Sequence, residues 1–557
     1  MTAVAHAPDA AHGLDASATL WELVVRRARR TPGAPALVQA ADDPADDRAL
    51  TFGALRDRAA RTAAGLHARG VRPHHTVAWQ LPTRIETVVL SLALARLGVR
   101  QTPLVPVYGE REVALALRAT GAAWYVHPGT WRGTDYAARA RRIRERHGIA
   151  PRTLTVYGTL PEAGPECLRE ADARGGPAEA RPGTAHGPGA DGLPPPPAEG
   201  RSVRWIYWTS GTTSDPRGVL HTDRSLIAGG SCLAHALRLG PDDVGSIAFP
   251  YAHIGGPDYL VMLLLYGFPA VLFERFALPE ALPGYRRHGV TTAGGSTAFY
   301  AMFLAEQRKR PREKLIPSLR LLAGGGAAKP AELYHEVVTE LGCRLAHGYG
   351  MTEAPMITMG SPDDSAEHLA TTEGRPPAAM EIRVTGPDGT PLPPGSEGEI
   401  RLRGEAVCQG YLDAAQTAAA FDDDGFLITG DLGRLQESGH LVLTGRTKDI
   451  IIRKGENISA KEIEQLLYAH PAIADAAVIG LPDAERGERV CAVVEQPRGA
   501  PRVTLEELTG HLRAAGLAAY KLPEQLEVLA ALPRNEALRK VLKFKLRERF
   551  AGPETGG

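Results

Sequence analysis

The stretch VRWIYWTSGTTSDPRGVLHTD, residues 203–223, decides the fold of this chain. Alternating apolar residues predict a strand at residues 203–208, and a helix is expected to begin near Ser225. The loop between them, residues 209–218, is dense in serine, threonine and glycine and carries one basic side chain, Arg217. Backbone N–H groups, hydroxyls and a cation are the groups that bind a polyphosphate. The loop therefore predicts a phosphate site; a polar hairpin turn is the alternative, and the G-x-x-x-x-G-K-[ST] pattern does not fit.

Length and composition describe a globular protein with more than one domain. The chain has 557 residues, of which 43% are hydrophobic and 23% are charged, and a chain of this length is expected to form at least two domains. Lys+Arg and Asp+Glu both number 64. The basic excess typical of nucleic-acid binders is missing, so no nucleic acid is expected as a partner.

The spacing of the cysteines and the composition of the first residues indicate the cellular compartment of the protein. The five cysteines lie far apart, with no CxxC pair and no Cys/His cluster, which predicts neither a disulfide framework nor a structural zinc site. The first 17 residues hold no basic segment followed by an apolar run, so a cytoplasmic location is expected. The most apolar stretch, residues 259–273, is short and contains Gly267 and Pro269, which favours a buried segment over a membrane span.

The order of elements predicts an α/β protein. Apolar strands are expected at residues 76–80, 101–107 and 124–127, with helices between them, as in βαβ units of a mostly parallel sheet. Capping boxes at Thr19 and Thr83, each followed by a glutamate three residues later, predict two helix starts. Residues 175–200 are rich in glycine, proline and alanine and predict a flexible excursion.

The last third of the chain changes character. From Glu381 the sequence favours β-structure, with turn signals at residues 387–389 and 394–395. A final α+β stretch is expected from about Asp449 to the end. The predicted order is therefore a large α/β body, a β-rich portion and a small α+β unit.

Three further segments carry groups that suit a nucleotide. Residues 349–353, Tyr-Gly-Met-Thr-Glu, offer an aromatic face for adenine, a hydroxyl for a phosphate and a carboxylate for Mg²⁺. Asp431, in the triplet Thr-Gly-Asp, could accept hydrogen bonds from both ribose hydroxyls. The glycines at 324–326 would let a flat base lie against the backbone. Each segment taken alone is also typical of an ordinary loop or turn.

Together these segments resemble a known family. The loop at 209–218, the GGA turn, YGMTE, TGD, the segment around Arg446 and the C-terminal LPRNEALRK occur in the order found in the acyl-CoA synthetase, peptide-synthetase adenylation-domain and luciferase superfamily. Ser214 stands where this family usually has glycine, and Arg217 where it usually has lysine. The texture near Gly295 and at residues 540–547 is similar to cyclohexanecarboxylate-type and other short or cyclic acid:CoA ligases.

The resemblance implies an organisation of two domains. The large N-terminal domain, residues 1–447, would hold parallel-rich sheets with helices and a β-rich portion at 381–447. The small α+β domain, residues 448–557, would be mobile and would rotate about a hinge at Lys448.

The resemblance also implies a role for each matching residue. Catalysis is assigned to Lys540, Thr352, Glu353 and Arg217, with Glu353 also the Mg²⁺ ligand. ATP and AMP binding is assigned to Thr209, Ser210, Gly211, Thr212, Thr213, Gly325, Gly326, Tyr349, Asp431 and Arg446. Gly455 would line the coenzyme A tunnel, and His253 and Gly295 would line the acid pocket. Matching the C-terminal segment requires one extra residue near Glu536, so Lys543 is the alternative to Lys540.

The function implied by the resemblance is activation of a small carboxylic acid. ATP with Mg²⁺ would give an acyl-adenylate and pyrophosphate, and coenzyme A would then take the acyl group. One alternative keeps the first half-reaction and gives the acyl group to a carrier-protein thiol. Another is a diazotase that activates nitrite for attack by an aromatic amine. A non-catalytic nucleotide-binding protein is the third.

Overall fold

The computed structural model describes residues 17–163, 193–209 and 216–551, apart from residues 328, 379, 455, 484, 498 and 536–539. Part of the expected excursion, residues 175–192, lies outside the described residues. So do Gly455 and four residues of the expected phosphate site, which are Ser210, Gly211, Thr212 and Thr213.

The largest sheet is built from the expected βαβ units and has the strand order β10-β9-β4-β3-β5-β8. Neighbouring strands are parallel, except that β9 and β10 form an antiparallel hairpin. The strands are β3 (Thr76–Trp79), β4 (Arg100–Pro103), β5 (Trp124–His127), β8 (Arg152–Thr155), β9 (Val203–Trp208) and β10 (Gly218–Thr222). The serine- and glycine-rich loop therefore connects two strands at one edge of this sheet, and α7 (Asp223–Ala236) begins after β10.

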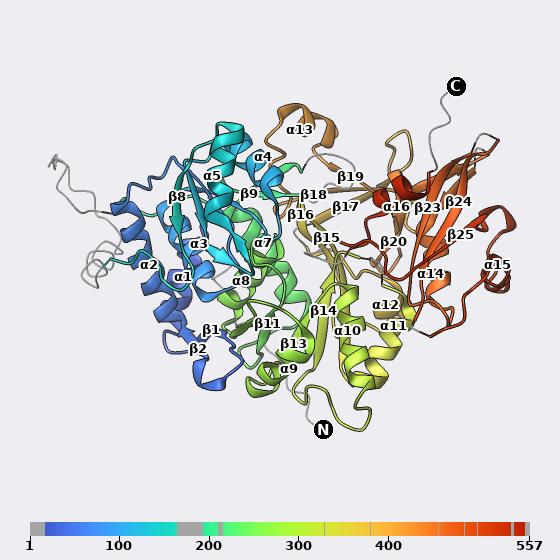
Figure 1. Cartoon of the computed structure of the whole chain (residues 1–557), viewed down its shortest axis with the longest axis horizontal. Helices are drawn as coiled ribbons and strands as arrows, with labels where there is room; N and C mark the ends of the chain where they lie inside the picture. Colours follow the sequence, from blue (N-terminus) through green and yellow to red (C-terminus); the bar gives the residue numbers. More distant parts are fainter. Residues whose placement is uncertain are drawn as a thin grey trace.

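Helices pack between the largest sheet and a second sheet (Figure 1). Every residue of α3 (Ile85–Leu97) is buried, as expected for a helix that lies between layers. The second sheet has the order β11-β12-β1-β2 and consists of β1 (Pro35–Gln39), β2 (Arg48–Thr51), β11 (Gly245–Ile247) and β12 (Ala270–Leu272). The other helices of this half are α1 (Leu20–Arg30), α2 (Phe52–Ala68), α4 (Glu110–Thr120), α5 (Tyr136–His147) and α8 (Gly255–Tyr266). A short β-ribbon joins β6 (Thr130–Trp131) to β7 (Thr134–Asp135).

A third sheet lies in the middle of the molecule (Figure 1). Its order is β13-β14-β15-β16, with the first three strands parallel and the last antiparallel. The strands are β13 (Thr292–Gly295), β14 (Leu321–Gly325), β15 (Arg344–Met351) and β16 (Ala354–Met359). The helices nearby are α9 (Leu278–Arg287), α10 (Thr297–Arg308), α11 (Ala331–Glu336) and α12 (Ala366–Thr371).

The β-rich portion is a four-stranded antiparallel sheet with the order β17-β18-β19-β20. It consists of β17 (Met380–Thr385), β18 (Gly398–Gly404), β19 (Leu427–Leu435) and β20 (Leu441–Arg446), with α13 (Ala414–Ala420) between β18 and β19. The β-structure expected from Glu381 is confirmed.

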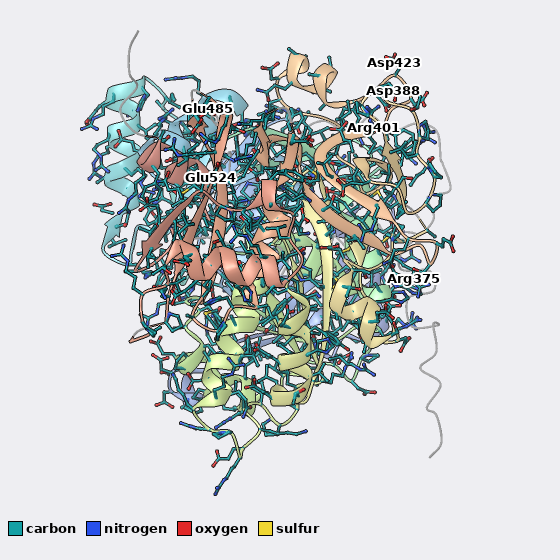
Figure 2. All side chains as sticks on the ribbon, turned by 90° about the vertical axis from the view of Figure 1, so that its right-hand side faces the viewer. Arg375, Asp388, Arg401, Asp423, Glu485 and Glu524 are labelled. Carbon is teal, nitrogen blue, oxygen red and sulfur yellow. The ribbon has the colours of Figure 1, made fainter. Side chains whose placement is uncertain are left out.

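The C-terminal residues form a separate sheet with its own apolar core (Figure 1, red). Its strands are β21 (Ile450–Arg453), β22 (Glu456–Ser459), β23 (Asp475–Asp483), β24 (Gly487–Glu495) and β25 (Gln525–Leu529). The helices are α14 (Ala460–Tyr468), α15 (Leu505–Ala514) and α16 (Lys543–Phe550). Glu524, labelled in Figure 2, pairs with Arg453 at 2.7 Å on this sheet.

Two local expectations are wrong. Thr83 does not cap α3: its hydroxyl donates to the carbonyl of Phe249, 3.0 Å away, and Arg84 is the N-cap residue without a side-chain hydrogen bond. The strand expected at 101–107 ends at Pro103. The carbonyl of Val105 instead accepts a hydrogen bond from the Gln80 side chain, because Pro106 has no N–H to continue a ladder.

The described end of the expected excursion contacts the body. The carbonyl of Pro194 accepts a hydrogen bond from Arg96 at 2.8 Å, and Leu193 packs against the main core. Among the described residues, no helix is both long and apolar enough to cross a membrane.

Candidate active site

Glycines at the carboxyl ends of β13, β14 and β15 let these strands approach closely. A β-carbon on Gly324 would lie 1.9 Å from the carbonyl oxygen of Gly295, and one on Gly325 would lie 2.4 Å from that of Gly348. No other residue fits at such distances. The strand ends therefore present bare backbone, which is where ligands of parallel sheets bind.

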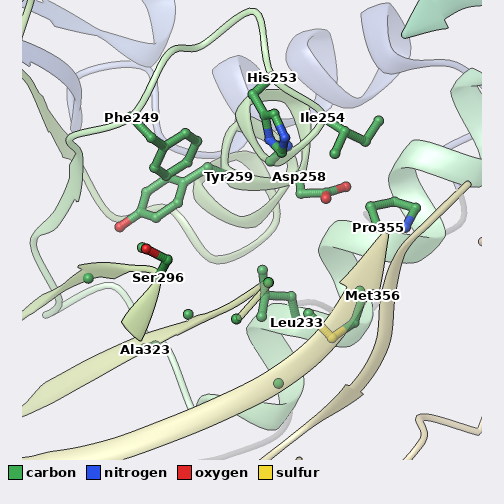
Figure 3. Close-up of a pocket in the computed structure, with 18 of the residues that line it drawn as sticks. Leu233, Phe249, His253, Ile254, Asp258, Tyr259, Ser296, Ala323, Pro355 and Met356 are labelled. Carbon is green, nitrogen blue, oxygen red and sulfur yellow. The ribbon is translucent and has the colours of Figure 1, made fainter. Parts of the chain in front are cut away.

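A cavity of about 310 Å³ lies over these strand ends. Apolar side chains make up much of its wall, and Figure 3 shows Leu233, Phe249, Ile254 and Met356 among them. Its polar lining includes Thr352, Asn535 and Lys540. A mostly apolar pocket with a few polar groups is the usual form of a small-molecule site.

A second cavity, of about 210 Å³, shares Gly326, Tyr349 and Lys540 with the first. Its lining includes Asp431 and Arg446 from β19 and β20. The two cavities therefore meet at Lys540, with the apolar space on one side and the charged groups on the other.

Glu353 follows the end of β15 and is buried. Its Oε1 accepts a hydrogen bond from the Tyr411 hydroxyl at 2.8 Å, and the Arg217 guanidinium lies 5.7 Å from the centre of the Tyr411 ring. The carbonyl of Thr352, one residue earlier, lies 2.8 Å from Nε2 of the buried His221. The Thr352–Glu353 segment is thus held from two directions.

Asp431 is buried and both of its carboxylate oxygens are engaged. Oδ1 pairs with Nε of Arg446 at 2.7 Å, and Oδ2 accepts from the Tyr349 hydroxyl. Asp431 and Arg446 are direct neighbours in the register of β19 and β20. Three of the expected nucleotide-binding residues therefore converge on one point.

Lys540 projects into the junction of the two cavities. A β-carbon placed on Gly326 would lie 3.4 Å from its Cε. Burial, and then the charge of Arg446, lowers the Lys540 pKa to about 8, although Asp431 and Glu353 oppose the shift. Lys543, the alternative, is 2.7 Å from Glu464 in an ion pair.

The two residues expected in the acid pocket both line the first cavity. Burial, and then the charge of Lys540, lowers the His253 pKa to about 4, so its ring is neutral near pH 7. Its Nδ1 accepts a hydrogen bond from the N–H of Gly255 at 3.4 Å. Gly295 lies against the Phe299 ring, which a β-carbon there would approach to 3.0 Å.

The described ends of the serine- and glycine-rich loop pair with each other. The N–H of Thr209 donates to the carbonyl of Arg217 at 3.0 Å, and the N–H of Arg217 donates to Oγ1 of Thr209 at 3.2 Å. Lys448 lies in the short 3₁₀ turn Thr447–Asp449, between β20 of the antiparallel sheet and β21 of the C-terminal sheet.

The sequence reasoning missed three residues of this site. Tyr411 and His221 are distant in sequence from the motif residues that they contact, whereas Asp258 follows His253, five residues earlier, on the wall of the same cavity. The only sequence signals were a tyrosine after glycine at 410–411 and a histidine shortly after the loop. Neither signal indicates which residue the tyrosine or the histidine contacts.

Comparison with known proteins identifies the family. A model of the AMP-binding enzyme family matches residues 24–412, and a model of the AMP-binding enzyme C-terminal domain matches residues 462–537. The chain belongs to the AMP-binding enzyme family. It is an adenylate-forming ligase, which confirms the resemblance and the α/β fold class.

Relatives span nearly the whole chain. A salicyl-AMP ligase / salicyl-S-ArCP synthetase of Mycobacterium tuberculosis is 34% identical, over 92% of this chain and 88% of that protein. A medium-chain fatty-acid–CoA ligase of Escherichia coli is 30% identical, over 89% and 85%. The solved structure of the O-succinylbenzoate coenzyme A synthetase of Bacillus subtilis, in complex with ATP and a magnesium ion, has a TM-score of 0.76 at 29% identity and covers 95% of this chain and 98% of that one. These comparisons do not favour the diazotase alternative.

Proposed function

We propose that this AMP-binding enzyme activates a small carboxylic acid with ATP and transfers the acyl group to the thiol of coenzyme A. The observation that carries the proposal is the position of Lys540 where the apolar cavity meets the cavity lined by Asp431 and Arg446. An acid in the first space and a nucleotide in the second would bring a carboxylate and an α-phosphorus together beside this ammonium group.

In the first half-reaction a carboxylate oxygen of the acid attacks the α-phosphorus and pyrophosphate leaves. Negative charge grows on the phosphoryl oxygens, so catalysis depends mainly on positioning and electrostatics. Lys540 and Arg217 supply positive charge, and the Thr352 hydroxyl donates to the α-phosphate. Asp431 receives the ribose hydroxyls, and Tyr349, packed beside Gly350, borders the adenine.

His253 orients the acid in this scheme. Because its Nδ1 accepts from Gly255, the proton of the neutral ring is on Nε2, which is then a donor for the acid's carboxylate. A neutral donor binds the carboxylate without suppressing its nucleophilicity as strongly as a cation would.

The residues present fit Mg²⁺. The buried carboxylate of Glu353 accepts one hydrogen bond, at Oε1, and the described residues contain no group of three or more metal-binding side chains. A single carboxylate with phosphate oxygens and water is the environment Mg²⁺ commonly takes. When bound, the ion would offset the negative charge of the phosphates.

In the second half-reaction the thiol sulfur attacks the acyl carbon, AMP leaves and the thiol proton goes to solvent. We propose that the boundary between the two domains lies between residues 447 and 448, with Lys448 as the hinge. Gly455 would lie beside the thiol-bearing arm of coenzyme A. Lys540 must then leave the junction. The contacts that would have to break include those from Ser459 to the carbonyl of Thr444 and from Lys461 to that of Leu443, each 2.7 Å long. The ion pair between Lys461 and Glu373, at 3.4 Å, is another.

A carrier-protein thiol is the second candidate acceptor. The salicyl-AMP ligase / salicyl-S-ArCP synthetase, at 34% identity, favours it, and the fatty-acid–CoA ligase, at 30%, favours coenzyme A. Acid-dependent exchange of pyrophosphate into ATP tests the first half-reaction, and AMP release with coenzyme A or with a phosphopantetheinyl carrier protein tests the second. Exchange without thioester formation from coenzyme A would reject the proposed acceptor but not acid activation.

A further inference from the structure

A carboxyl group in the wall of the acid cavity has no partner among the residues that the structure describes. Asp258, in the first turn of α8, is only 3% exposed and lines the cavity. Its Oδ1 is buried, and its carboxyl group makes no hydrogen bond or ion pair with any of the residues that the structure describes. Burial raises its pKa well above the ordinary value, because a buried site disfavours the charged carboxylate.

The Tyr207 hydroxyl and the Cys232 thiol lie close enough for the charge of Asp258 to raise their pKa values, yet neither donates a hydrogen bond to Oδ1 of Asp258. A β-carbon on Gly229 of α7 would lie 3.1 Å from Oδ1 and 3.2 Å from Cγ of Pro355, so the carboxyl packs against a glycine and a proline. Figure 3 shows it between Ile254 and Pro355, with Leu233 and Met356 nearby. None of these side chains can donate a hydrogen bond.

The same protein satisfies a comparable carboxyl elsewhere. Asp223, on α7 and 1% exposed, accepts from Nε1 of Trp205 at 2.7 Å and from the N–H of Leu20 at 3.1 Å. Buried polar groups are nearly always paired, because an unpaired one loses its hydration without compensation. The missing partner of Asp258 is therefore expected to come from a molecule that enters the cavity.

We propose that Asp258 is a specificity residue whose carboxyl accepts a hydrogen bond from an amino or hydroxyl group on the body of the activated acid. The inference rests on the proposed function and names its substrate class. The substrate is a small acid with its carboxylate at the junction beside Lys540 and an N–H or O–H group within the apolar cavity. A site built around such a bond discriminates more strongly than apolar contact alone.

A series of ring-substituted benzoates tests the preference. Amino- and hydroxybenzoates are compared with methyl- and fluorobenzoates substituted at the same positions, by kcat/KM in pyrophosphate exchange. At one position the donor-bearing acid is expected to exceed its isosteres by roughly tenfold or more. Comparing the aminobenzoates with the hydroxybenzoates shows whether an N–H or an O–H group donates the hydrogen bond. Equal kcat/KM for donors and isosteres at every position overturns the inference and leaves acid activation standing, whereas no exchange with any acid overturns both.

Two variants connect the preference to Asp258. Asp258→Leu keeps the number and branching of the side-chain heavy atoms, removes both oxygens, and is expected to bring the donor-to-isostere ratio close to one. Asp258→Asn keeps an acceptor oxygen and is expected to retain a preference. Asp223→Asn, at the satisfied carboxyl outside the cavity, should leave the ratio unchanged. A ratio that persists in Asp258→Leu overturns the assignment.

Thermal unfolding separates this role from a structural one. Replacing an unsatisfied buried group by an apolar one of similar shape is neutral or stabilising, so Asp258→Leu is expected to keep or raise Tm without ligand. The infrared stretch of the Asp258 carboxyl group should shift when the preferred acid binds, and should be absent in Asp258→Asn. A clear fall in Tm, or a stretch insensitive to the acid, contradicts the proposal.

Discussion

The hydroxyl of Tyr411 donates to Oε1 of Glu353 at 2.8 Å, and the Arg217 guanidinium lies over the same tyrosine ring at 5.7 Å. One aromatic side chain thus connects the carboxylate proposed for Mg²⁺ with a cation proposed for the phosphates. It fixes the orientation of the carboxylate and leaves its second oxygen for a ligand.

Tyr411→Phe tests this connection. The phenylalanine keeps the ring under Arg217 and removes the donor, and a hydrogen bond to a charged group contributes about 1.5–3 kcal/mol. The rate of adenylate formation is expected to fall about 10- to 100-fold, with more Mg²⁺ needed for half-maximal rate. Tyr334→Phe is the control, because the buried Tyr334 hydroxyl has no hydrogen-bond partner in the described part of the chain. An unchanged Mg²⁺ requirement in Tyr411→Phe would reject the role.

Lys540→Ala separates the two half-reactions. Removing the ammonium group from the cavity junction is expected to lower acid-dependent pyrophosphate exchange by about 10²- to 10³-fold. Transfer from a supplied acyl-adenylate should fall far less. The lysine is needed only in the first half-reaction, where negative charge develops on the oxygens of the α-phosphate. Lys543→Ala, which breaks the pair with Glu464, is the comparison. A larger loss of pyrophosphate exchange in Lys543→Ala than in Lys540→Ala would assign the catalytic role to Lys543.

The lowered pKa of Lys540 predicts a pH profile. With its pKa near 8, the free enzyme loses this cation as the pH rises past that value, so kcat/KM for ATP in the exchange reaction should decline above about pH 8. Lys540→Arg keeps its charge and should move the decline upward. Since the unfolded chain holds the proton up to its ordinary pKa of 10.5, this group should add stability as the pH rises between the two values. A profile identical in both proteins would assign the decline to another group.

Asp431→Asn should act mainly on nucleotide binding. The substitution removes the carboxylate that pairs with Arg446 and accepts from Tyr349, and leaves a buried amide in its place. The KM for ATP is expected to rise at least about tenfold, since the lost bonds are charge-assisted. Asp422→Asn, which breaks the pair with Arg401 elsewhere in the molecule, should leave the KM unchanged.

Lys448→Pro tests the hinge. Proline fixes its φ near −65°, so a backbone rotation about φ at this position would be blocked. Pyrophosphate exchange should persist, and thioester formation should fall sharply. Equal loss of both half-reactions, with Lys448→Ala behaving like the parent protein, would place the hinge elsewhere or remove it.

Local signals predicted much of this fold. The strands at 203–208 and 124–127 were expected where they occur, and Thr19 caps α1 through the N–H of Glu22 as its pattern indicates. The expected box at Thr83 is absent because the Thr83 hydroxyl oxygen accepts a hydrogen bond from the N–H of Tyr251, 3.0 Å away, instead of from the first turn of α3. A capping pattern cannot register a competing donor that lies 168 residues away in the chain.

The sequence by itself determined the family and the types of group that a nucleotide needs, because motif residues keep their order and spacing along the chain. Only the tertiary structure decided which groups meet: Lys540 at the junction of two cavities, Tyr411 on Glu353, and Asp258 in the wall of the first cavity, without a partner among the described residues. These relationships join segments far apart in sequence through packing. Burial and pairing, which set the charge state of each group, are properties of that packing and are absent from the order of residues.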